Sequence, residues 1–126
     1  MKALIVDDNT EITDMMAQYL QLKGYECTVL NHGKHAIEQI LTKKYDFVLL
    51  DIAMPDISGL DIIDGLKKMD KLKDHKIVVL TASSVSDDEL QSFLKKGAVA
   101  YIRKPIELTQ FLKVIKQITE FPIFND

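Results

Sequence analysis

The run from Phe47 to Asp51 constrains the fold of this chain more than any other stretch. Phe47–Leu50 are four consecutive apolar residues, a pattern typical of a strand that is buried on both faces in a parallel sheet covered by helices. Asp51 follows where this strand should end. A carboxylate in such a place loses hydration unless neighbouring groups compensate for the loss. The sequence therefore predicts a parallel sheet with a polar site at the end of this strand.

Strand and helix patterns alternate along the whole chain. Short apolar runs predict five strands, within residues 3–6, 25–30, 47–50, 77–80 and 98–102. After each strand, apolar residues recur at helical spacing, which predicts five helices. Asn9, Ser58 and Ser86 are suited to cap helices at their amino ends, and Gly24 and Gly97 are suited to end two of them.

This alternation defines the expected fold. Strand–helix units with short connections favour an α/β domain with a doubly wound, five-stranded parallel sheet in the order 2-1-3-4-5 and five helices. The polar segment Lys71–Lys76 is expected to be a connection. We expect one domain over residues 1–126, because the length suits one domain and no linker or repeat is visible.

Composition narrows the classes of function. The chain has a net charge of −3, whereas nucleic-acid-binding proteins usually have an excess of positive charge. No apolar run is long enough to predict a membrane span, and the first residues do not resemble a signal peptide. Cys27 is the only cysteine, so no internal disulfide is possible. These features predict a soluble, cytoplasmic protein.

Polar residues follow four of the five predicted strands. Asp7 and Asp8 follow the first, Asp51 the third, Thr81 the fourth and Lys104 the fifth. The first and third strands are neighbours in the predicted order, so we expect the three carboxylates to meet. An oxygen-rich cluster suits Mg²⁺, and an ammonium and a hydroxyl suit phosphoryl oxygens. The set predicts phosphoryl transfer, with Asp51 as the nucleophile.

These motifs together resemble the receiver domains of two-component response regulators, which have a flavodoxin-like fold. The resemblance extends over the whole chain. Among receiver domains, the chain resembles those that occur as stand-alone proteins, such as the chemotaxis regulator. The matching segments are Leu4–Asp8, Leu49–Gly59, Leu80–Ala82 and Tyr101–Pro105.

The resemblance implies a role for each acid of the cluster. Asp51 would accept a phosphoryl group from a histidine kinase or a histidine phosphotransfer domain. Mg²⁺ would be held by Asp7, Asp8, Asp51 and the backbone carbonyl of Ala53. The domain would support its own phosphorylation and dephosphorylation, and it would not be an enzyme that turns over external substrates.

The resemblance also implies a conformational switch. Thr81 and Lys104 would contact the phosphoryl oxygens, and the small Ala82 would leave room for them. Thr81 would move toward the phosphoryl group and Tyr101 would rotate inward, which changes the face formed by the fourth helix, the fifth strand and the fifth helix. The peptide bond before Pro105 would be cis.

The implied partner is a downstream protein that binds this face, with no direct contact to nucleic acid or membrane. The domain would be a monomer or a phosphorylation-dependent dimer. The alternative is a receiver domain that belongs to a longer regulator with a DNA-binding or enzymatic output domain.

Three other classes of protein fit the sequence less well. A phosphatase of the haloacid dehalogenase type needs Asp-x-Asp, and here Ala53 takes the place of the second acid. A nucleotide- or flavin-binding module would need a phosphate-binding glycine motif, and the chain has none. His32 and His35 have no third residue spaced to complete a metal site, so we interpret them as surface residues.

Overall fold

The computed structural model describes residues 1–120, and its elements alternate in the predicted order. One domain over 1–126 stays a prediction, because 121–126 lie outside the described residues. The elements are β1 (Lys2–Val6), α1 (Thr10–Leu22), β2 (Glu26–Leu30), α2 (Ala36–Thr42), β3 (Phe47–Asp51), α3 (Gly59–Lys68), η1 (Leu72–Asp74), β4 (Ile77–Thr81), α4 (Asp87–Lys96), β5 (Ala100–Arg103) and α5 (Leu108–Glu120).

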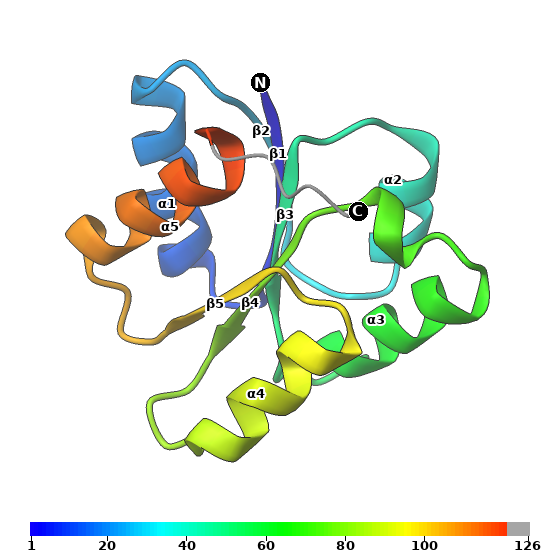
Figure 1. The fold of residues 1–126 in the computed structure, drawn as a ribbon. Helices are drawn as coiled ribbons and strands as arrows, with labels where there is room; N and C mark the ends of the chain where they lie inside the picture. The colour runs from blue at the N-terminus through cyan, green and yellow to red at the C-terminus, as the bar shows by residue number, and fades with distance from the viewer. Residues whose placement is uncertain (121–126) are drawn as a thin grey trace.

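The five strands form one parallel sheet in the order β2-β1-β3-β4-β5, which confirms the predicted topology. Helices α1 and α5 cover one face of the sheet, and α2, α3 and α4 cover the other (Figure 1). Every residue of β3 and β4 is buried. The unbroken apolar run of β3 predicted a strand buried on both faces, and in the structure helices cover both faces of the sheet.

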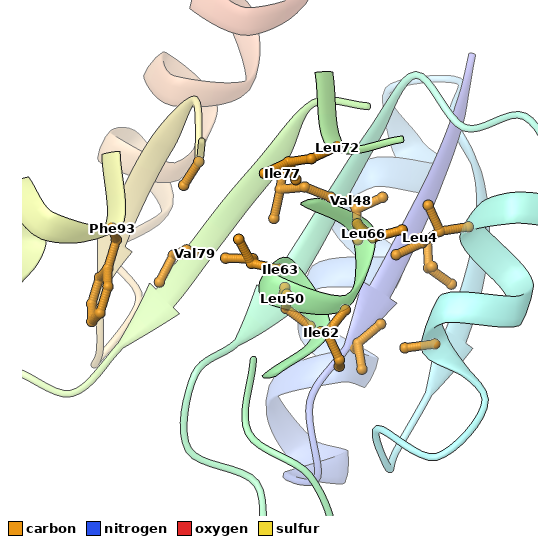
Figure 2. Close-up of a cluster of buried hydrophobic side chains, with 14 of the residues drawn as sticks. Leu4, Val48, Leu50, Ile62, Ile63, Leu66, Leu72, Ile77, Val79 and Phe93 are labelled. Carbon is orange, nitrogen blue, oxygen red and sulfur yellow. The ribbon is translucent and has the colours of Figure 1, made fainter. Parts of the chain in front are cut away.

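Each face of the sheet has its own hydrophobic core. Figure 2 shows the core between the sheet and helices α2, α3 and α4, in which Ile62, Ile63 and Leu66 of α3 pack over the strands. On the opposite face, α1 and α5 pack on the sheet through Met16, Leu20, Phe111, Ile115 and Ile118. The two cores hold the strands in register, so the ends of β1, β3, β4 and β5 lie at one edge.

The predicted helix ends are confirmed by their hydrogen bonds. The side chains of Asn9, Ser58 and Ser86 each accept the N–H of the residue three positions later, at 3.1 to 3.2 Å. Gly97 ends α4 with φ +122°, a conformation that side chains rarely adopt. Gly24, just beyond α1, has φ +93°.

The boundaries of β1 to β4 differ from the predicted ones by one residue, and two further differences concern the segment before β4 and the start of β5. The polar segment 71–76 contains the 3-10 helix η1, whose Leu72 is buried in the core on the face that α2, α3 and α4 cover. Strand β5 begins at Ala100 rather than Ala98, because the Ala98 N–H closes α4 by donating to the Phe93 carbonyl at 3.1 Å. Within residues 1–120, no helix has the length and apolar character needed to span a membrane.

Candidate functional site

Three carboxylates meet at the carboxyl edge of the sheet. Asp51 is the last residue of β3, and Asp7 and Asp8 follow β1, whose Val6 is in register with Leu50. One oxygen of each carboxylate lies within 4.8 Å of the others. Asp7 is fully buried and Asp51 is 3% exposed, whereas Asp8 is exposed. The predicted cluster is therefore present, with a single acid at its solvent side.

One cation, Lys104, reaches this cluster from the end of β5. Its Nζ lies 2.8 Å from Asp7 Oδ2 and 3.5 Å from Asp51 Oδ2. Burial alone would lower the pKa of Lys104, but the two carboxylates outweigh it and raise the pKa. Three ionised carboxylates and one ammonium leave two negative charges without a partner in the cluster.

The surplus of negative charge acts on Asp51. Burial and then the charge of Asp7 raise the pKa of Asp51 to about 6, although the Ala53 N–H and Lys104 act in the opposite direction. The Ala53 N–H donates to Asp51 Oδ1 at 3.2 Å. Ionised Asp51 is thus destabilised by its surroundings and gains from any additional positive charge.

The donor set fits a hard divalent cation. Asp7 Oδ1 accepts the Asn9 N–H at 2.9 Å, but the buried Oδ2 has no aligned hydrogen-bond donor among residues 1–120, only the nearby Lys104 charge. Mg²⁺ binds carboxylate oxygens and typically keeps several waters, so two or three carboxylates with one open side are sufficient. The residues that could hold it are Asp7, Asp8 and Asp51.

A close backbone approach fixes the position of Asp51. The Gly59 N–H donates to the Ile52 carbonyl at 3.0 Å, which brings the first residue of α3 against the end of β3. A Cβ at position 59 would lie 2.5 Å from the Asp51 carbonyl oxygen. Only glycine allows this contact without displacing the backbone that carries the nucleophile candidate.

A fourth carboxylate, that of Asp56, organises the loop after β3, and its role was not predicted from the sequence. Asp56 accepts the N–H of Gly33 at 3.0 and 3.2 Å and the N–H of Lys34 at 3.0 Å. These hydrogen bonds, led by that of Gly33, lower the pKa of Asp56. The loop that contains Ala53 is therefore tied to the connection between β2 and α2. No local pattern in the sequence identifies Gly33 as the partner of Asp56, because the two residues are 23 positions apart.

The two switch candidates lie on adjacent strands near the cluster. Thr81 is buried at the end of β4, and its Oγ1 lies 3.4 Å from the Ala82 carbonyl oxygen, its only hydrogen-bonding contact within residues 1–120. Tyr101 is half-buried and packs against the core beneath α3 and α4. The Lys104–Pro105 peptide bond is cis, as the resemblance implies.

The histidine pair is separate from this cluster. His32 and His35 are exposed, and their rings meet edge to face with centroids 5.7 Å apart. His35 Nδ1 lies 3.7 Å from Glu38. In the described part of the chain, only the Asp7–Asp8–Asp51 cluster brings three possible metal ligands together.

Comparison with known proteins identifies the class to which this fold and site belong. The family model of the response regulator receiver domain matches residues 3–116, and the chain belongs to that family. Its members are receiver domains of two-component response regulators, a class of signalling domain.

Relatives include stand-alone and longer regulators. The polar-differentiation response regulator DivK of Brucella anthropi is 31% identical over 113 residues, which cover 90% of this chain and 91% of DivK. The phosphate regulon transcriptional regulatory protein PhoB of Pseudomonas aeruginosa is 35% identical over 115 residues, 91% of this chain. The chain spans about half the length of that PhoB, since the match covers 50% of it.

Solved structures give the same family and fold. The response regulator TrrA of Thermotoga maritima, solved in complex with Mg²⁺-BeF, has a TM-score of 0.79 and 33% identity, with 93% of this chain and 97% of that one covered. The receiver domain of a Francisella response regulator has a TM-score of 0.85 and 25% identity, covering 94% of this chain and 96% of the other.

Proposed function

We propose that this domain accepts a phosphoryl group on Asp51 with the help of Mg²⁺ and passes the resulting state to a protein partner. The observation that carries the proposal is the position of Asp51: a buried carboxylate, beside two other acids and 3.5 Å from Lys104 Nζ. A structural acid in a strand end would be paired or exposed, and Asp51 is neither fully compensated nor solvated.

Asp51 would act as the nucleophile of the transfer. One of its oxygens forms a bond to phosphorus while the bond between phosphorus and the donor histidine nitrogen breaks, and the released imidazole takes up a proton. Mg²⁺, held by Asp7, Asp8, Asp51 and the Ala53 carbonyl, would supply positive charge for the phosphoryl oxygens. The donor would be a histidine kinase or a histidine phosphotransfer domain.

Lys104 and Thr81 would stabilise the product. The Lys104 ammonium already lies near both buried carboxylates, and a phosphoryl group on Asp51 would give it a more highly charged partner. The Thr81 hydroxyl, which makes a long contact to the Ala82 carbonyl oxygen in the structure, would turn toward a phosphoryl oxygen. Tyr101 would follow it and alter the α4–β5–α5 face, where a cytoplasmic downstream protein would bind.

A phosphorylation assay tests this function directly. The protein is incubated with acetyl phosphate and Mg²⁺, and intact-mass analysis should find one added phosphoryl group. Asp51→Asn should not be labelled, whereas Asp14→Asn, which changes an exposed carboxylate of α1, should be labelled like the parent. Chelation of the metal should suppress labelling. Labelling that persists in Asp51→Asn would refute the site assignment.

A further inference from the structure

The only arginine among the 16 lysines and arginines of the sequence holds the connection between β4 and α4. Arg103 Nη1 donates to the carbonyl oxygens of Ser83, at 3.1 Å, and Val85, at 2.6 Å. Its Nη2 donates to Asp87 Oδ1 at 2.7 Å. A lysine could not span three acceptors in this way, because a guanidinium has five donors in a fixed planar fork.

The connection that Arg103 holds begins at the site. Residue Thr81 ends β4 in register with Arg103, and Asp87 is the first residue of α4. Every second position between them, at 83, 85 and 87, is bonded to the same side chain. Arg103 thus fixes the path of the backbone from Thr81 to α4.

Two consecutive cations at the end of β5 serve different parts of the molecule. Lys104 reaches Asp7 and Asp51, and Arg103 lies on the opposite side, in the same row as Tyr101 on the face that α4 covers. The backbone joins the two roles, since the Lys104 N–H donates to the Thr81 carbonyl at 2.6 Å. A displacement of Thr81 would therefore change the contacts of both the Lys104 and the Arg103 side chain.

We propose that Arg103 is a positioning residue that holds Thr81 and the connection after it in the resting arrangement, and so limits how readily Asp51 is modified. This inference rests on the proposed function. In the structure the Thr81 hydroxyl contacts the Ala82 carbonyl and not Asp51. Any shift of Thr81 toward a phosphoryl group pulls on a connection that Arg103 holds at three points, so these contacts favour the unmodified state.

The direction in which the affinity for an anion changes when Arg103 is replaced distinguishes a positioning role from a purely electrostatic one. Removal of a positive charge near the site should weaken the binding of an anion. Removal of a contact that favours the resting state should strengthen the binding of an anion. A ligand that binds the modified state then no longer has to break that contact. Arg103→Gln is therefore expected to bind a phosphoryl analogue more tightly although it has lost a cation.

The experiment titrates parent and variants with beryllium fluoride in the presence of Mg²⁺, by calorimetry. Arg103→Gln should bind about fivefold more tightly, which corresponds to about 1 kcal/mol, the net worth of one hydrogen bond that the resting state keeps and the modified state gives up. Arg103→Lys should behave like Arg103→Gln, because an ammonium keeps the charge but not the fork. Asp87→Asn should change the affinity less than twofold, because that pair is exposed at the aspartate and the carbonyl contacts remain.

Hydrogen exchange without any ligand provides the second measurement. Amides of residues 82–87 should exchange faster in Arg103→Gln than in the parent, and those of β3 should not change. If Arg103→Gln binds the analogue as the parent does, or more weakly, the positioning role is overturned, and so it is if Arg103→Gln binds more tightly without faster exchange at residues 82–87. A parent that does not bind the analogue overturns the proposed function, and this inference with it.

Discussion

Replacement of Asp51 by asparagine should stabilise the protein, and the gain should depend on pH. Asp51 has its pKa raised from 3.8 to about 6, so its ionised form is less favourable in the folded than in the unfolded chain. Stability from this group is complete below pH 4 and is lost as the pH rises through 6. The difference of roughly two pKa units, at about 1.4 kcal/mol each, corresponds to about 3 kcal/mol at pH 8.

Urea unfolding at pH 4 and pH 8 in the presence of a chelator measures this effect. At pH 8 the midpoint of Asp51→Asn should lie roughly 1.5 M above that of the parent, for a slope of about 2 kcal/mol per molar urea. At pH 4 the two midpoints should nearly coincide. Asp14→Asn, at an exposed position, should stay within about 0.5 kcal/mol of the parent at both pH values.

Two outcomes of the unfolding experiment would contradict a destabilising charge at Asp51. If Asp51→Asn is no more stable than the parent at pH 8, the carboxylate is not destabilised by its surroundings. If the gain is equally large at pH 4, it comes from packing and not from the charge. Added Mg²⁺ should stabilise the parent more than the variant, since the variant lacks one of the proposed ligands.

Three further substitutions test the surroundings of the site. Lys104→Met should destabilise the protein by about 3 kcal/mol at pH 8 and by less at pH 5, because it leaves buried carboxylates unpaired; equal losses in urea unfolding at both pH values would contradict this. Gly59→Ala should cost about 1–3 kcal/mol, because the new Cβ meets the backbone at the end of β3, whereas Gly65→Ala in the same helix meets only a side-chain end and should cost less. Asp56→Ala should speed hydrogen exchange at the Gly33 amide, and a variant with unchanged exchange would show that this carboxylate does not hold the loop.

The sheet and the acidic cluster were predictable because they depend on simple periodic patterns. An unbroken apolar run such as Phe47–Leu50 occurs where both faces of a strand are covered, and the alternation with helices then gives parallel strands. Parallel strands all end at one edge, so residues that follow them, such as Asp7 and Asp51, meet there. Caps such as Ser86 depend on residues three positions apart and are equally visible.

The contacts that hold the loops could not be predicted, because they join residues far apart in the sequence. Asp56 bonds to Gly33 across 23 positions and Arg103 to Ser83 across 20, and no local pattern selects these partners. Strand β5 was predicted to begin too early for a different, local reason. Ala98 is apolar enough for a strand, but its N–H is taken by the last turn of α4. The burial of Leu72 was not predictable either, because Leu72 is a single apolar residue in a polar segment and forms no periodic pattern with other apolar residues.

The packing of Gly33 has a consequence for how this sequence can diverge. A Cβ at position 33 would collide with the Ile57 side chain and lie 3.2 Å from Met54 Cε, while the Asp56 carboxylate draws the two loops together. A larger residue at position 33 therefore requires a smaller one at position 57. These two positions should change together in a selection experiment. The loss of stability caused by Gly33→Ala should be smaller in combination with Ile57→Ala, which removes the colliding methyl group and leaves the Ile57 carbonyl oxygen and Met54 Cε at 3.2 Å from the new Cβ.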